Sequence, residues 1–229
     1  MVEHSNKYDM KKYILLFLVA AFVSCTKDDV AISDFTPEDG YITFISGDNG
    51  TRTAIKENAG DDNDEIVWQA GDKIGIYSPD ISQARNYAVE VSANDADKRN
   101  VSFVTDLQYA SNKSHTFYAY YPYSANNPTS YRTTEISGNL TPTQDGTIAP
   151  NAFMWAKATD VAAGSKDVAL NFQHPFTYLD IKLKSSSAHI GKTLHTLTFV
   201  AEEGTTLAGD YTLNFKTGAL NFTKTYNSV

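Results

Sequence analysis

Apolar and polar residues alternate along several short runs of this chain. The alternation is clearest in VALNFQ (168–173) and FTYLDIKLK (176–184). A period of two is typical of half-buried β-strands, because successive side chains point to opposite faces of a sheet. Both runs are therefore predicted to be strands with one face in a core. Their buried positions are expected to be Leu170, Phe172, Leu179, Ile181 and Leu183.

The rest of the chain carries the same signal. The run DYTLNFKTGALNFT (210–223) predicts a hairpin that turns at Thr217 and Gly218. Further strands are expected at residues 41–46, 73–78, 86–91, 100–105, 115–122 and 196–201. No window of a dozen residues keeps the stripe of an amphipathic helix, and the 14 tyrosines and 12 phenylalanines favour strands. Short strands separated by turn residues predict an all-β protein, an antiparallel β-sandwich.

The N-terminal segment has the pattern of a secretory signal peptide. Two lysines precede a run of about ten apolar residues, whereas a membrane span needs roughly 20. We predict that residues 1–24 are a signal peptide and that Met10 is the true start. The segment ends in FVSC, which resembles the lipobox of bacterial lipoproteins, where cleavage between Ser24 and Cys25 leaves an acylated cysteine as the first mature residue. The alternative is an ordinary cysteine within a plain signal peptide.

Residues 25–35 are expected to form a lipidated tether. The sequence TKDD directly after Cys25 resembles a signal that carries lipoproteins to the outer face of the outer membrane. Charge is also expected in a solvated tether, which is the simpler interpretation. In both cases we predict a protein at the cell outer membrane, exposed at the surface and anchored by lipid.

The charge and cysteine content exclude two classes of function. The formal net charge is −8, which is unfavourable for binding nucleic acid, because that affinity depends on cations that meet phosphates. Cys25 is the only cysteine. The chain therefore forms no internal disulfide and offers no cysteine pair to a metal.

Candidate catalytic or metal-binding residues are few. The sequence has no glycine-rich phosphate loop, no GxSxG and no HExxH. His189 and His195 lack a third and fourth metal ligand. The loop GDDNDE (60–65) lacks the ligand spacing of an EF-hand, and a solvated acidic turn is the alternative to a calcium site. We therefore predict no enzyme, no cofactor and no metal site.

An aromatic cluster is the remaining candidate for ligand contact. FYAYYPYS (117–124) contains four tyrosines that could stack on sugar rings: Tyr118, Tyr120, Tyr121 and Tyr123. Alternation sends neighbouring tyrosines to opposite faces of a strand, so at most half of them can share one platform. Packing in the core or at a sheet edge is the competing interpretation.

Taken in order, several motifs resemble the fimbrillins, the lipoprotein subunits of type V pili. The motifs are TRT (51–53), WQAGDKIGIYS (68–78), FYAYYPYS (117–124), LTPTQDGT (140–147), FMWAKATD (153–160) and LNFQHPFTYLDIKL (170–183). Their order and spacing extend over residues 36–222, behind the lipobox. Within them, Trp68, Gly71 and Asp72 are interpreted as a core aromatic that leads into a tight turn.

The resemblance implies two tandem transthyretin-like β-sandwich domains, the first over residues 36–185. It also implies that an arginine-specific protease cuts after an arginine that follows the first strand. Arg52 matches that position, although an arginine that pairs locally is an equal alternative. The freed groove would accept a strand from another fimbrillin subunit, which is a form of β-augmentation. A host or bacterial surface ligand is a further expected partner.

Residues 186–229 are expected to form only an incomplete second β-sandwich, because roughly 45 residues make three or four strands, too few for a closed sandwich. The chain is then either a truncated fragment or a terminating subunit that accepts a strand but donates none. The leading functional hypothesis is a pilus subunit or pilus-associated adhesin. The alternative is a surface lipoprotein that binds glycans through exposed aromatics, and an enzyme is third.

Overall fold

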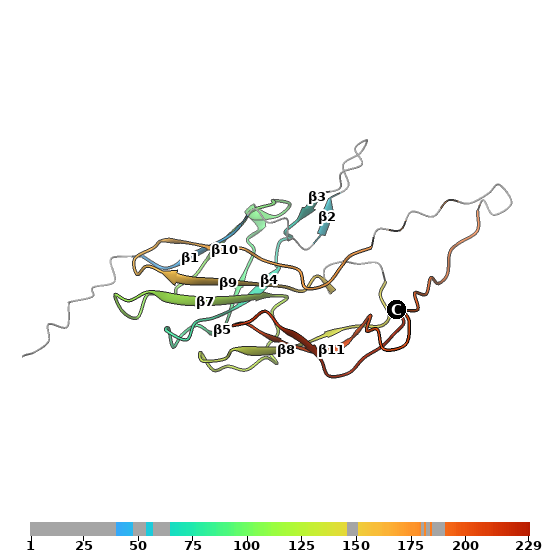
Figure 1. The fold of residues 1–229 in the computed structure, drawn as a ribbon. Coiled ribbons are helices and arrows are strands. Elements are labelled where there is room, and N and C mark those ends of the chain that lie inside the picture. Colours follow the sequence, from blue (N-terminus) through green and yellow to red (C-terminus); the bar gives the residue numbers. More distant parts are fainter. Residues whose placement is uncertain are drawn as a thin grey trace, which may run out of the picture. The chain divides into compact units, whose positions relative to one another are not determined.

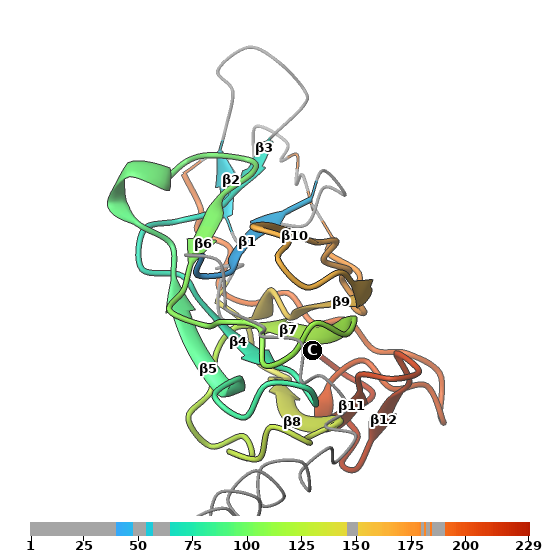
Figure 2. The ribbon, with the colours of Figure 1, turned by 90° about the vertical axis from the view of Figure 1, so that its left-hand side faces the viewer.

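The computed structural model describes residues 40–47, 54–56, 65–145, 151–179, 181, 184 and 191–229. These residues are all-β, with one short 3-10 turn at Ala93–Asp95. The strands, labelled in Figure 1 except for β6 and β12, which are labelled in Figure 2, are β1 (Thr43–Ser46), β2 (Ala54–Lys56), β3 (Glu65–Val67), β4 (Lys73–Tyr77), β5 (Arg85–Glu90), β6 (Ser102–Val104), β7 (His115–Tyr121), β8 (Glu135–Leu140), β9 (Met154–Val161), β10 (Asp167–Leu170), β11 (Gly209–Asn214) and β12 (Leu220–Phe222).

Three sheets carry the fold. The central sheet has the strand order β5-β4-β7-β9, and all its pairs are antiparallel. The β1 sheet has the order β10-β1-β6, in which β1 runs parallel to β10 and antiparallel to β6. The β11 sheet has the order β12-β11-β8. A separate pair is formed by β2 and β3.

The central sheet lies between the other two sheets. Its strand β7 is apolar on both faces and packs against both of them. Phe117 in β7 makes an edge contact with Phe44 of the β1 sheet, at 5.1 Å between ring centroids. Its neighbour Tyr118 points the other way and stacks on Phe215, which follows β11, at 5.2 Å. Figure 2 shows the β1 sheet and the β11 sheet on opposite sides of β4 and β7. The predicted sandwich is therefore confirmed, with an additional third layer.

The turn before β4 is formed as the sequence predicts. Trp68 is fully buried, and Gly71 has a φ of +82°, which favours glycine. The Asp72 carboxylate accepts a hydrogen bond of 2.8 Å from the backbone N–H of Gln69. These three positions therefore have the structural roles expected of them: a core aromatic, a left-handed turn residue and a side chain that closes the turn.

The strand predicted at residues 176–184 is not formed by the part of that run that the structure describes, which is residues 176–179, 181 and 184. Leu170 and Phe172 are buried as expected, but Leu179 is 68% exposed and Ile181 is 43% exposed, while Leu183 lies outside the described residues. After β10 the chain keeps one bridge, from Gln173 to Trp155. Pro175 follows two residues later and has no N–H to extend a ladder, and the described residues beyond it pair with none of the described strands.

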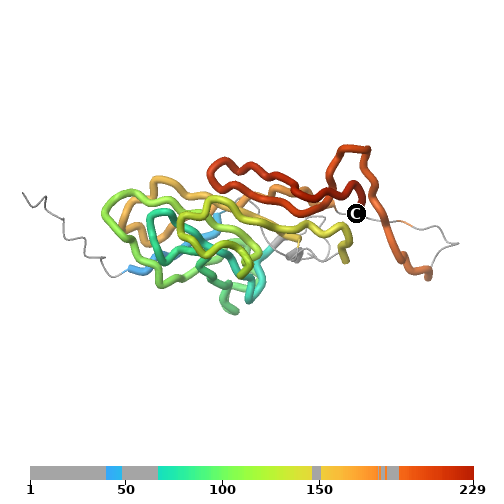
Figure 3. Tube along the Cα trace, turned by 90° about the horizontal axis from the view of Figure 1, so that it is seen from below, coloured from blue at the N-terminus to red at the C-terminus, as the bar shows by residue number. Residues whose placement is uncertain are grey.

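The C-terminal segment packs onto the rest of the fold through β11. The hairpin predicted at 210–223 is confirmed as β11 and β12, with Gly218 at a φ of +74° in its turn. Strand β11 also pairs with β8 over six residue pairs, from Gly209 with Leu140 to Asn214 with Glu135. Figure 3 shows the red C-terminal strands beside the yellow-green β8. The run 196–201 has only a bridge from Val200 to Ser228 and is not a strand. The domain boundary at residue 185 stays a prediction.

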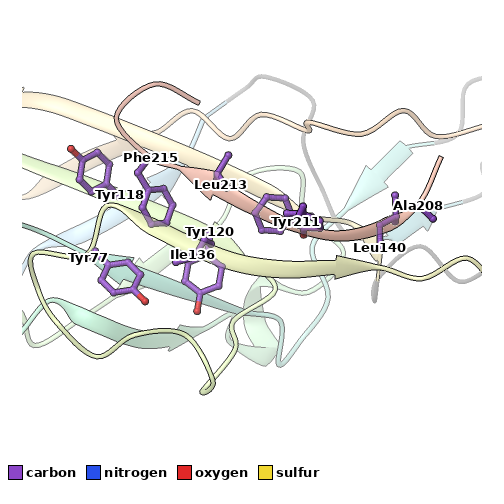
Figure 4. Close-up of a cluster of buried hydrophobic side chains, with 10 residues drawn as sticks. Tyr77, Tyr118, Tyr120, Ile136, Leu140, Ala208, Tyr211, Leu213 and Phe215 are labelled. Carbon is purple, nitrogen blue, oxygen red and sulfur yellow. The ribbon is translucent and has the colours of Figure 1, made fainter. Parts of the chain in front are cut away.

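The central sheet and the β11 sheet pack against each other through a second group of aromatic side chains, those around Phe215 (Figure 4). Phe215 lies 5.7 Å from Tyr77 and 6.3 Å from Tyr120, measured between ring centroids, in addition to its stack on Tyr118. All four side chains are at most 4% exposed. The C-terminal hairpin is thus tied to the middle of the chain by apolar burial as well as by backbone hydrogen bonds.

Candidate functional site

Strand β1 occupies the middle of its sheet, although it is the first strand described. Thr43 to Ser46 pair with Asp167 to Leu170 on the parallel side, and Thr43 to Ile45 pair with Val104 to Ser102 on the antiparallel side. A middle strand completes both of its neighbours. Its removal would leave two new edges, each with unpaired backbone donors and acceptors.

Backbone and hydroxyl groups also hold both ends of β1. At the N-terminal end, the Ile42 N–H donates to the Leu107 carbonyl at 2.8 Å, and the Thr105 hydroxyl donates to the Ile42 carbonyl at 2.6 Å. At the C-terminal end, the Ser46 hydroxyl accepts from the Val101 N–H at 2.8 Å. The strand is thus held along its whole length by hydrogen bonds.

The inner face of β1 closes the core. Ile42 and Phe44 are fully buried, whereas Thr43 and Ile45 are half-buried. Burial of one such apolar side chain contributes about 1.5–3 kcal/mol. The strand predicted at residues 41–46 is therefore confirmed as β1 (Thr43–Ser46). This strand both covers a core and pairs with two neighbours.

The predicted processing and lipidation residues lie outside the described part of the chain. These are Ser24, Cys25 and Arg52. In the sequence, Arg52 falls between Ser46, where β1 ends, and Ala54, where β2 begins. The acidic residues 60–64 of the considered calcium loop and His189 also lie outside it. Among the described residues, no group of three or more His, Cys, Asp or Glu side chains could hold a metal ion.

The four tyrosines of the aromatic cluster do not form an exposed platform. Tyr118 and Tyr120 face the β11 sheet, and Tyr121 faces Trp68 on the opposite side. These three are at most 4% exposed, and Tyr123 is half-buried. Alternation along β7 separates them, as the sequence argument anticipates, and the third layer covers the face that would otherwise meet a ligand. Tyr118 and Tyr121 therefore pack in the core, whereas Tyr120 and Tyr123 also line a cavity beside β8 and β11.

A half-buried histidine, His174, lies beside Phe153 and Tyr178. The Nδ1 atom of His174 lies 3.3 Å from the Phe153 carbonyl and 3.2 Å from the Tyr178 hydroxyl, and its buried Nε2 has no partner in the described structure. Burial lowers the pKa of His174 below the usual 6.5 of histidine. The same burial raises the pKa of Tyr178 to about 12, so that its hydroxyl stays neutral.

Acid should destabilise the protein partly through His174. Its unfolded form takes up a proton at a higher pH than its folded form, so stability falls as the pH drops below about 6.5. We expect the Tm to decrease between about pH 7.5 and 5.5, and the decrease to be smaller in His174→Gln. His195→Gln, at an exposed position, is the matched control. An identical decrease in all three proteins would contradict this assignment.

Comparison with known proteins gives the family. The family described as fimbrillin-like matches residues 51–228, which is most of the chain. The chain belongs to the fimbrillin-like family. This membership supports a role as a subunit in pili or adhesion. Among curated proteins, none matches the chain.

Two solved structures are similar to this fimbrillin-like chain. One is a candidate cell adhesion protein from Bacteroides ovatus, with 17% identity and a TM-score of 0.42, and the match covers 83% of this chain and 72% of that one. The other is a candidate cell adhesion protein from Bacteroides uniformis, with 20% identity and a TM-score of 0.46, covering 83% and 70%.

The position of β1 between β10 and β6 is the feature that sequence reasoning missed. The run at 41–46 signals a strand, but nothing in the pattern identifies β10 as its parallel partner. A local signal does exist at Gly47, where a Cβ would lie 2.1 Å from the Asn171 side-chain oxygen. A glycine directly after a strand can mark such a close approach of two chain segments. In the described residues no helix is long or apolar enough to cross a membrane.

Proposed function

We propose that this fimbrillin-like protein is a surface subunit of a pilus, or an adhesin associated with one, anchored in the outer membrane by lipid. Cleavage between Ser24 and Cys25 would leave Cys25 as the acylated residue. Its partners would be other fimbrillin subunits and a ligand on a host or bacterial surface. Family membership supports the pilus role, and the sequence FVSC supports the anchor.

Assembly would proceed by exchange of β1 for a strand of another subunit. The observation that carries this proposal is the position of β1 between β10 and β6, with Ile42 and Phe44 fully buried. Loss of these two side chains removes about 3–6 kcal/mol of apolar burial. It also opens two strand edges. An incoming strand with alternating apolar residues would restore both the burial and the hydrogen bonds.

Digestion of the purified full chain with an arginine-specific protease tests the exchange. Cleavage after Arg52 should lower the Tm by roughly 10 °C or more, because several kcal/mol are lost from a domain of this size. The cut protein should associate, as measured by light scattering, and a peptide of residues 40–47 should return it to a monomer. Mass spectrometry of the released fragment reports whether Cys25 carries acyl chains.

The control is Arg52→Lys, which keeps the charge and blocks only this cut. It is needed because the chain also contains Arg85, Arg99 and Arg132. The variant should keep the Tm and monomeric state of undigested protein under the same treatment. Strand exchange is refuted if folded protein resists cleavage at Arg52, or if the cut protein stays monomeric with an unchanged Tm.

A further inference from the structure

A cavity of about 180 Å³ lies where the end of β7 meets strands β8 and β11. One wall is aromatic: Phe153, Phe176 and Tyr211 pack edge to face or tilted, and the first two each lie 5.1 Å from the Tyr211 ring centroid. The volume is close to the roughly 150 Å³ that holds a single benzene ring in a protein interior. The cavity therefore has room for one six-membered ring.

Neutral polar groups complete the lining. Three asparagines contribute to it, Asn127, Asn139 and Asn151, and none of the described residues around the cavity is charged. The Asn127 side-chain oxygen accepts a hydrogen bond from the Ser137 N–H at 3.2 Å, which holds that amide in place. The Asn139 amide nitrogen donates to Asp210.

The Tyr211 hydroxyl is a fixed donor at this site. It lies over Gly138, which also lines the cavity, and a Cβ at Gly138 would come within 2.4 Å of the hydroxyl oxygen. This hydroxyl makes no hydrogen bond to any residue that the structure describes. Burial raises the pKa of Tyr211, so the group stays protonated at neutral pH. Figure 4 shows Tyr211 on β11 close to Leu140.

We propose that this cavity binds one neutral pyranose ring, such as the terminal residue of a glycan. A pyranose presents apolar C–H faces, which pack on aromatic rings, and hydroxyls that need both donors and acceptors. Apolar walls with a few fixed polar groups are the usual form of a small-molecule site. A purely apolar ligand would leave the Tyr211 hydroxyl unpaired, and an anionic ligand would find no cation among the described lining residues.

This site goes beyond strand exchange and does not depend on it. Strand β1 lies on the opposite side of the central sheet (Figure 2), whereas the cavity lies on the side of the β11 sheet. Sugar binding can therefore be measured on the uncut monomer. Its failure would leave the assembly proposal untouched, and the converse also holds.

Titration of the purified full chain tests the inference. The probes are the methyl glycosides of glucose, galactose, mannose and N-acetylglucosamine, followed by saturation-transfer NMR and calorimetry. At least one of them should bind. Tyr211→Phe, which removes only the hydroxyl, should weaken that binding about tenfold, the effect of one lost hydrogen bond of about 1.4 kcal/mol. Phe176→Ala should weaken it at least as much.

Tyr109→Phe is the matched control. Its hydroxyl donates to the Ser165 carbonyl at 2.8 Å, and Tyr109 does not line the cavity. Its affinity should equal that of the unaltered protein, and circular dichroism confirms that each variant is folded. The inference is overturned if no glycoside binds the folded protein or if Tyr211→Phe binds as well as Tyr109→Phe. It is also overturned if N-acetylphenylalanine amide binds and the glycosides do not, because the cavity would then accept a peptide side chain.

Discussion

Replacement of Trp68 by alanine should lower the free energy of unfolding by about 3–5 kcal/mol. Trp68 is fully buried and meets three aromatic rings edge to face. Its ring centroid lies 5.3 Å from Phe103 in β6, 5.7 Å from Tyr121 in β7 and 5.7 Å from Phe172 after β10. The β1 sheet and the central sheet both lose packing when this side chain is removed.

Urea denaturation followed by circular dichroism measures this change. Trp68→Phe should cost less than Trp68→Ala, because it retains an aromatic ring. It also removes the buried indole N–H, which has no hydrogen-bond partner in the described structure. Leu179→Ala is the control, since Leu179 is 68% exposed and should change stability by no more than about 0.5 kcal/mol. Equal losses in Trp68→Ala and Leu179→Ala would show that Trp68 is not a core residue.

Periodicity predicts burial only for some of the alternating residues. Alternation correctly placed Leu170 and Phe172 in the core. The same pattern failed at Leu179, because a strand needs a partner and the chain beyond Pro175 has none among the described strands. Period-two spacing states which side chains share a face. It does not state whether that face meets another sheet.

Strand β8 illustrates the opposite failure. The sequence EISGNL of β8 has few apolar residues, and no strand is expected there. In the structure Ile136 and Leu140 are buried, and Gly138 between them leaves room for the Tyr211 ring, which would lie 2.4 Å from a Cβ. The aromatic ring that packs over Gly138 belongs to a residue 73 positions later, so nothing in the local sequence predicts this contact. The cavity beside Gly138 could not be predicted from the sequence for the same reason.

The tyrosines of β7 were recognised as a cluster, but their surroundings depend on the third layer. A strand in a two-layer sandwich has one covered face, so half of its aromatics would remain available to a ligand. Here the β11 sheet covers the second face and buries Tyr118 and Tyr120. The pairing of β11 with β8 joins residues far apart in the sequence. No pattern within either strand specifies that pairing.

Replacement of Phe215 by alanine should cost about 3–5 kcal/mol as well, and the loss should arise at the β11 sheet. Phe215 is fully buried against Tyr77, Tyr118 and Tyr120. Its backbone N–H donates to the Thr134 carbonyl at 2.8 Å, next to the start of β8. The side chain thus joins the C-terminal hairpin to the central sheet by apolar contact.

Hydrogen exchange distinguishes a local from a global effect. In Phe215→Ala the amides of β8 and β11 should lose more protection than those of β1, because sub-global opening follows the weakened packing. Phe222→Ala is the matched control: Phe222 is half-buried and touches Tyr211 and Phe176, so its loss should be smaller. If Phe215→Ala costs less than about 1 kcal/mol, the hairpin is not held by this contact. The six residue pairs between β8 and β11 would then be the stronger link between the hairpin and the rest of the fold.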